Sequence, residues 1–166
     1  KMLKTIPRTS IIGFIIGVLP GAGATIASFL AYGMERNLVS DEEKEKFGKG
    51  SVHGLAAPET ANNAACSGAF VPLLTLGIPG SGTTAVMLGA LLGFGIQPGP
   101  RLYITNPEIF WSVIMSMYIG MVVLLILNLP LIPYIARILA VPKNYLIPLI
   151  LFFSITGIYV MSFNNF

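Results

Sequence analysis

Two short runs of Pro, Gly and hydroxyl residues interrupt otherwise apolar sequence. Residues 20–25 read Pro-Gly-Ala-Gly-Ala-Thr, and residues 79–84 read Pro-Gly-Ser-Gly-Thr-Thr. Glycine allows backbone conformations that are closed to other residues, and it lets a ligand approach the main chain. A helix that begins at such a run exposes amide N–H groups without intrahelical partners, at the positive end of the helix dipole. Each run therefore predicts an anion site that needs no basic side chain.

The predicted substrate ligands in these runs are main-chain amides and side-chain hydroxyls. The residues are Pro20, Gly21, Gly23, Thr25, Pro79, Gly80, Ser81, Thr83 and Thr84. Two such helix ends facing each other would bind a multiply charged carboxylate without a buried Arg, which is costly in lipid. Close helix packing is the alternative use of these glycines. Packing explains the pairs Gly13–Gly17 and Gly89–Gly93, but not a Pro-Gly-x-Gly-x-Thr pattern that occurs twice.

A second polar run, residues 57–65, reads Ala-Pro-Glu-Thr-Ala-Asn-Asn-Ala-Ala. The amides of Asn62 and Asn63 offer both donors and acceptors, so we interpret them as substrate or ion ligands beside the broken segments. Glu59 is either a proton or cation partner or a carboxylate that stabilises the start of a short helix. The coupling ion, Na⁺ or H⁺, is expected near exposed carbonyls and hydroxyls. Its predicted ligands are Asn62, Thr83, Thr84 and Glu59.

Other kinds of site find no support in the sequence. A P-loop requires a Lys before its Ser or Thr, and both runs lack it. The single Cys66 excludes an internal disulfide, and without a Cys/His cluster we expect no metal site. No Ser is partnered by His and Asp in a recognised arrangement, so a membrane hydrolase is unsupported. We expect no enzyme and no cofactor. His53, the one histidine, follows a charged loop and is interpreted as a surface residue.

The composition indicates an integral membrane protein. Hydrophobic residues make up 54% of the chain and charged residues 10%, where soluble domains have roughly a quarter charged. The net charge of +3 is scattered over segment ends, so we expect no nucleic-acid partner. The predicted fold is all-α: a polytopic bundle with two Pro-Gly-broken helices and two ordinary transmembrane helices. Its segments are the broken runs 9–34 and 69–96, a charged loop at 35–50, and helices at 109–139 and 146–161.

The breaks lie at membrane depth, where unsatisfied backbone groups are tolerated only beside protein or a water-filled cavity. A pair of Gly/Pro-interrupted apolar segments indicates the binding site of a secondary transporter. Each arm is too short to cross about 30 Å of hydrocarbon alone. The arms therefore form either a discontinuous spanning helix or a hairpin. Basic residues before and after the first broken segment favour the hairpin, since Lys and Arg prefer the cytoplasmic side.

Several motifs in order resemble the large membrane subunit of the tripartite tricarboxylate transporter family, the TctA family. They are residues 17–25 (GVLPGAGAT), 47–50 (FGKG), 57–64 (APETANNA), 72–80 (PLLTLGIPG), 97–100 (QPGP), 116–120 (SMYIG) and 127–130 (LNLP). The resemblance implies a multi-pass permease of the bacterial inner membrane that takes up citrate or other carboxylates by symport. It implies two partners, a periplasmic solute-binding protein and a small membrane subunit.

Members of that family are much longer than this chain and have two related halves of opposite orientation. The resemblance places this chain at the start and middle of the second half, and it assigns a substrate-facing role to the two Pro-Gly runs, their threonines and the Asn pair. Cys66 and Ser67 depart from the small residues that the family has there, which is expected to alter packing more than specificity. A non-transporting membrane scaffold and a passive organic-anion channel are the alternatives. The identity of the carboxylate, the choice between Na⁺ and H⁺, and the oligomeric state stay open.

Overall fold

The computed structural model describes residues 2–138 and 142–162, and these residues form helices without strands. Contacts divide the chain into two units, residues 1–113 and 114–166, which are described separately. The helices in chain order are α1 (Thr5–Val18), α2 (Gly23–Leu38), α3 (Asp41–Lys44), α4 (Val52–Gly68), α5 (Phe70–Leu76), α6 (Gly82–Gly93), α7 (Leu102–Thr105), α8 (Pro107–Ile138) and α9 (Lys143–Met161). The predicted all-helical class is therefore confirmed.

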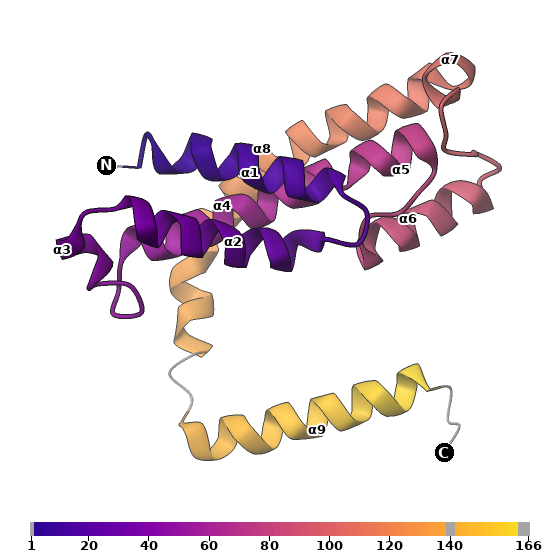
Figure 1. Cartoon of the computed structure of the whole chain (residues 1–166). Coiled ribbons are helices and arrows are strands. Elements are labelled where there is room, and N and C mark those ends of the chain that lie inside the picture. The colour runs from indigo at the N-terminus through magenta and orange to yellow at the C-terminus, as the bar shows by residue number, and fades with distance from the viewer. Residues whose placement is uncertain (1, 139–141, 163–166) are drawn as a thin grey trace. The chain divides into compact units, whose positions relative to one another are not determined.

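Helices α1 and α2 form an antiparallel hairpin, which Figure 1 shows beside α4. Thr5 at the start of α1 donates a hydrogen bond to Glu35 in the last turns of α2, so the two ends meet. The first Pro-Gly run forms the linker at the other end of this hairpin, between residues 18 and 23. Of the two arrangements left open by the sequence, the hairpin is therefore the one observed.

Small residues spaced four apart line the contact between these helices. The buried residues are Thr5, Thr9, Gly13 and Gly17 on α1, Ala27, Ala31 and Glu35 on α2, and Ala57, Ala61 and Ala65 on α4. This spacing places them on one face of each helix. Because the side chains are small, the helix backbones approach closely, as in membrane helix pairs.

The glycines of α1 are required by this close approach. A Cβ on Gly13 would overlap the carbonyl oxygen of Ala61 and lie 2.6 Å from its Cα. A Cβ on Gly17 would meet the carbonyl of Ala65 in the same way. The packing interpretation of Gly13 and Gly17 is thus correct. The packing interpretation is not supported for Gly89 and Gly93, because a Cβ at either would meet no atom within 4 Å in the described part of the chain.

Two predicted boundaries differ from the structure. The segment 35–50 was expected to be a loop, but α2 continues through Leu38 and α3 follows at Asp41. Residues 52–68 form one helix, so Glu59 lies in its interior and not at the start of a short helix. Ser51 begins that helix, because its hydroxyl accepts a hydrogen bond from the Gly54 amide at 3.1 Å. Pro58 lies within the helix without ending it.

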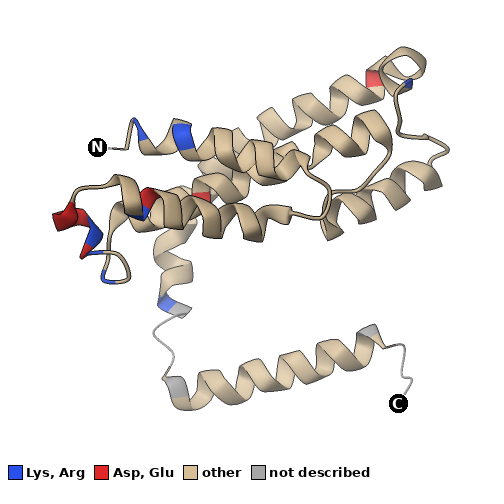
Figure 2. Ribbon diagram, viewed as in Figure 1, with Lys and Arg blue, Asp and Glu red and all other residues tan. Residues whose placement is uncertain are grey.

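The antiparallel hairpin gathers charge at one end of the first unit. Figure 2 shows Lys, Arg, Asp and Glu around the start of α1, the end of α2 and α3, while the linker between α1 and α2 carries none. The basic residues on both flanks of the hairpin therefore lie at the same end. This arrangement agrees with a hairpin that enters and leaves a membrane by its positively charged face.

The second broken segment consists of α5 and α6 joined by residues 77–81. Gly77 ends α5 in a left-handed conformation with φ 70°, and the Ile78 amide bonds back to the Pro72 carbonyl at 3.2 Å. This is the usual glycine-ended helix terminus. The capping pair Ser81 and Thr84 then starts α6.

One helix among the described residues is long and apolar enough to span a membrane. It runs over Pro107–Arg137, has a mean hydropathy of 2.4, and none of its most apolar stretch is buried within the structure. Pro130 and Pro133 lie inside α8, which continues through both to Ile138. The second predicted transmembrane helix corresponds to α9, whose apolar stretch Asn144–Val160 is shorter. Residue 139 of the predicted first span lies outside the described residues.

Candidate substrate site

The first Pro-Gly run has the geometry of an open helix start. Gly21 and Gly23 have φ values of 86° and 69°, which favour glycine. A Cβ placed on either would meet no atom of the described residues within 4 Å apart from its chain neighbours and its own helix backbone. Helix α2 begins at Gly23 with no side-chain cap. Its first amides, together with the exposed hydroxyl of Thr25, therefore form an uncapped positive helix end. Pro20 is also exposed.

The second run is capped by its own side chains. The Thr84 amide donates to the Ser81 hydroxyl at 3.3 Å, and the Thr84 hydroxyl accepts from the Ser81 amide at 2.8 Å. The Thr84 hydroxyl also donates to the Ser81 carbonyl at 2.9 Å, and only 2% of Thr84 is exposed. A ligand would have to displace these bonds to use Thr84 directly. Thr83 is exposed, and Pro79 is half-buried.

The two runs approach each other at the end of α1. A Cβ on Gly80 would lie 3.6 Å from the Gly17 carbonyl oxygen and 3.4 Å from the Ala69 Cβ. Gly68, the last residue of α4, also faces this turn of α1, and a Cβ on it would be 3.1 Å from the Val18 amide nitrogen. The linker that contains Pro79 and Gly80 therefore crosses the last turn of α1, immediately before the first linker.

The Asn pair does not act as one group. Asn62 is half-buried, and its amide donates to the Ser28 hydroxyl of α2 at 3.3 Å. Asn63 is exposed, and its amide donates to the Glu59 carbonyl one turn earlier at 2.9 Å. Adjacent helix residues do not share a face, which explains the separation. Ser28 was not identified from the sequence, and Glu59 is exposed.

A buried polar cluster at the other end of the hairpin was missed. Glu35 is 1% exposed and lies among Thr5 and Arg8 of α1 and His53 of α4. Thr5 donates to Glu35 Oε1 at 2.7 Å, Arg8 pairs with Oε2, and His53 Nδ1 lies 3.2 Å from Oε1. The surface interpretation of His53 is wrong, because its side chain is only 15% exposed. The signal available in the sequence was the spacing of Glu35, four residues after Ala31, which puts it on the buried face of α2.

The hydrogen-bond and ion-pair partners of Glu35 keep its carboxylate ionised. Glu35 lies near the charged end of the hairpin and not in the membrane-spanning helix α8. Burial by itself would raise the pKa of Glu35. The hydrogen bonds from Thr5, Arg8 and His53 and the charge of Arg8 outweigh burial, so the pKa lies below its ordinary value. The cluster thus holds an ion pair between two helices of the hairpin and connects both to α4.

The sequence model of the Tripartite tricarboxylate transporter TctA family matches residues 1–166. The chain belongs to this family. The resemblance found in the motifs is thereby confirmed. TctA is a transporter family and not an enzyme family.

Two proteins of Agrobacterium vitis are similar to this TctA chain. The "Uncharacterized 52.8 kDa protein in TAR-I ttuC' 3'region" is 46% identical over 159 residues, which cover 96% of the chain and 31% of the relative. The "Uncharacterized protein in TAR-II ttuC' 3'region" is 45% identical over 154 residues, which cover 93% of the chain and 63% of the relative. The chain therefore spans less than two thirds of either relative. No solved structure matches it.

Within this TctA chain, the structure joins some of the predicted site residues and separates others. Gly80 of the second run lies beside Gly17, three residues before the first run, whereas Asn63 and Glu59 are exposed on α4. Cys66 is exposed as well, and its thiol lies 3.9 Å from Asn62 Oδ1. The residues 2–138 and 142–162 contain no group of three His, Cys, Asp or Glu side chains that could hold a metal ion. The ligand roles of these residues stay predictions.

Proposed function

We propose that the TctA chain is part of the permease subunit of a tripartite uptake system for tricarboxylates or related organic carboxylates. The permease is a multi-pass protein of the bacterial inner membrane and a symporter driven by a Na⁺ or H⁺ gradient. A periplasmic solute-binding protein delivers the carboxylate, and a small membrane subunit completes the complex. Family membership supports transport, and the long apolar helix α8 supports a membrane location.

The substrate class is inferred from two observations, the uncapped start of α2 and the position of Gly80 of the second Pro-Gly linker beside Gly17 in the last turn of α1. Amide donors at a helix start bind carboxylates through charge-assisted hydrogen bonds. Two linkers at one place supply donors to more than one carboxylate group of the same molecule. The proposed substrate ligands are Pro20, Gly21, Gly23, Thr25, Asn62, Asn63, Pro79, Gly80, Ser81, Thr83 and Thr84.

The coupling cation is proposed to bind near the start of α6 and the middle of α4. Its candidate ligands are Asn62, Thr83, Thr84 and Glu59. Thr83 and Glu59 are exposed. Asn62 and Thr84 already have partners, Ser28 and Ser81, so they would exchange one hydrogen bond for a ligand.

The test is uptake of radiolabelled citrate by cells that contain the full-length subunit with both partners. Thr25→Val removes an exposed hydroxyl and keeps the side-chain shape, so the helix is left intact. Loss of one hydrogen bond to a charged ligand is expected to raise the KM of uptake by roughly tenfold or more. Thr75→Val is the matched control, because Thr75 is also exposed and its hydroxyl only donates to the Val71 carbonyl at 2.6 Å.

The same assay separates the alternatives. A symporter shows saturable uptake that requires a cation gradient, a passive channel shows flux without such coupling, and a scaffold shows no flux of its own. Unchanged KM in both Thr25→Val and Thr83→Val, with wild-type levels in the membrane, would reject the helix-end site.

A further inference from the structure

The buried cluster at the charged end of the hairpin joins ionisable groups from three helices. Arg8 comes from α1, Glu35 from α2 and His53 from α4. These helices also carry the first Pro-Gly linker and the Asn residues. Ionisable residues inside a transporter bundle commonly belong to ion or proton pathways. None of the residues proposed above as substrate or ion ligands belongs to this cluster.

The hydrogen bonds determine which nitrogen of His53 can take up a proton. Thr5 has one hydroxyl hydrogen, and it points to Glu35 Oε1 at 2.7 Å. His53 Nδ1 lies 3.0 Å from that hydroxyl oxygen and 3.2 Å from Glu35 Oε1. Both oxygens can therefore only accept from the imidazole, so Nδ1 carries the hydrogen. In the neutral ring, Nε2 then has a free lone pair for a second proton.

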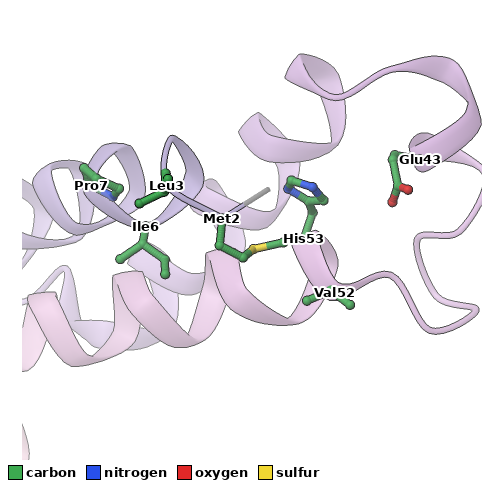
Figure 3. A pocket seen from close by; sticks show the side chains of 7 residues that line it. All are labelled: Met2, Leu3, Ile6, Pro7, Glu43, Val52 and His53. Atoms are coloured by element: carbon green, nitrogen blue, oxygen red, sulfur yellow. The ribbon is translucent and has the colours of Figure 1, made fainter.

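His53 also lies at a cavity through which a proton can reach it. The cavity has a volume of about 600 Å³ and opens to the surface. Figure 3 shows the imidazole among the lining side chains, which come from the start of α1, from α3 and from the start of α4. Met2, Leu3, Ile6, Pro7 and Val52 make most of the lining apolar, and Glu43 is the one carboxylate in it.

We propose that His53 is a proton-binding site of the transporter and that the coupling ion is H⁺, bound at His53 in place of the α4 and α6 ion ligands proposed above. This inference rests on the proposed transport function. The step is a proton transfer: the Nε2 lone pair takes H⁺ from hydronium in the cavity, an N–H bond forms, and water is left. Release reverses it. The Glu35 carboxylate, which also pairs with Arg8, stabilises the imidazolium. Glu43, which pairs with Lys46 at 2.7 Å, lines the same cavity.

Proton binding at this place acts on the hairpin that holds the substrate linker. Thr5 and Glu35 lie at the base of α1 and α2, and both contact the imidazole. Residues 19–22 lie at the opposite end of the same two helices. A new charge on His53 strengthens its bond to Glu35 and so holds the base of the hairpin more tightly on α4.

The experiment uses the full-length subunit with its small subunit in liposomes, with binding protein and citrate outside and the membrane potential clamped. An inside-alkaline gradient of one pH unit supports up to about tenfold accumulation per proton. Wild type is expected to accumulate citrate under this gradient and not under a Na⁺ gradient at equal pH. His53→Gln keeps a donor toward Glu35 and is expected to lose accumulation while retaining equilibration of citrate.

A milder pair of variants covers the case in which His53→Gln fails to insert. Glu43→Gln removes a carboxylate that lines the cavity and that also pairs with Lys46 at 2.7 Å. Because the imidazolium loses a nearby negative charge, half-maximal uptake is expected at lower external pH. Glu45→Gln removes an exposed carboxylate of the same segment that does not line the cavity, and its pH profile should match wild type. A purely structural role of the cluster would leave both profiles unchanged.

The outcomes separate the two proposals. Accumulation by His53→Gln under the pH gradient, coincident pH profiles for Glu43→Gln and wild type, or accumulation by wild type under the Na⁺ gradient alone would overturn the proton site and leave uptake itself standing. Absence of any citrate movement in wild type, with all components present, would instead overturn the proposed function.

Discussion

The carbonyl oxygen of Gly17 faces Gly80, 3.6 Å from the position that a Cβ on Gly80 would occupy. The two residues belong to different broken segments, and each lies beside or within a Pro-Gly run. Their contact brings the start of α6 against the last turn of α1. It is the structural reason for treating the two runs as one site.

Gly80 should tolerate Ala but not a larger side chain. A Cβ there makes ordinary van der Waals contact with Ala69 and Gly17, whereas the branches of Val would push the second linker away. We expect near-normal citrate uptake for Gly80→Ala and strongly reduced uptake for Gly80→Val at equal membrane abundance. Equal uptake by the two variants would show that the contact between the linkers is not needed.

Gly13→Ala and Gly17→Ala should destabilise the three-helix unit. Their Cβ atoms would overlap the backbone of Ala61 and Ala65, which cannot move without separating α1 from α4. Forced overlap of this kind typically costs 1–3 kcal/mol or more. Thermal unfolding in detergent should show lower Tm values.

Gly33→Ala is the matched control for these glycine variants. Gly33 lies within α2, and a Cβ on it would meet no atom within 4 Å. Because Ala favours an exposed helix interior over Gly by about 0.5–1 kcal/mol, its Tm should equal or exceed that of wild type. A Tm loss for Gly33→Ala as large as that for Gly13→Ala would contradict the packing explanation.

Variants of Asn62 and Asn63 should differ in their effects on stability and on transport. Asn62→Ala removes the hydrogen bond to Ser28, which connects α4 with α2. The free energy of unfolding should fall by about 1 kcal/mol, and the Tm should fall with it. Asn63 bonds only to the Glu59 carbonyl of its own helix, so Asn63→Ala should leave the Tm unchanged. If Asn63 binds substrate or ion, uptake falls in that variant. Wild-type uptake would remove Asn63 from the site.

The effect of substituting Thr84 should depend on whether the new side chain keeps a hydroxyl. Thr84→Ser keeps the hydroxyl that accepts from the Ser81 amide and donates to the Ser81 carbonyl. Thr84→Val removes that hydroxyl and leaves these two half-buried groups without it, although the amide of residue 84 still donates to the Ser81 hydroxyl. Removal of such a cap costs about 0.5–2 kcal/mol. We expect lower Tm and lower uptake for Val, and values close to wild type for Ser. Similar uptake by both variants would argue against any requirement for the hydroxyl.

Acid should weaken the hairpin through Glu35. Its pKa in the folded protein lies below the ordinary value of 4.5, so its stabilising contribution is complete above pH 4.5. That contribution is lost as the pH falls through the lower, folded-state pKa. Tm measured against pH should therefore decline more steeply in acid for wild type than for Glu35→Gln. Parallel acid profiles would show that the carboxylate contributes nothing.

Local features of the sequence were sufficient for the helical class and for the two interruptions. Apolar runs determine where helices can lie in a membrane protein, and Pro with Gly determines where a helix stops, because both effects depend on neighbouring residues alone. The same locality explains the wrong assignments. Acidic residues after Met34 were taken for a loop, although Glu35 shares the four-residue spacing of Ala27 and Ala31 and continues the buried face of α2.

The tertiary structure alone decided which polar groups meet. Glu35 and His53 became partners because the hairpin brings the end of α2 beside the starts of α1 and α4, residues far apart in sequence. Gly80 reached Gly17 because the linker after α5 returns across α1. Such contacts depend on which helix faces pack against each other. The sequence pattern indicates which residues share a face, but not which faces meet. The residue types thus determined an apolar helical protein with two broken segments, and the packing of those segments determined where its charges and linkers converge.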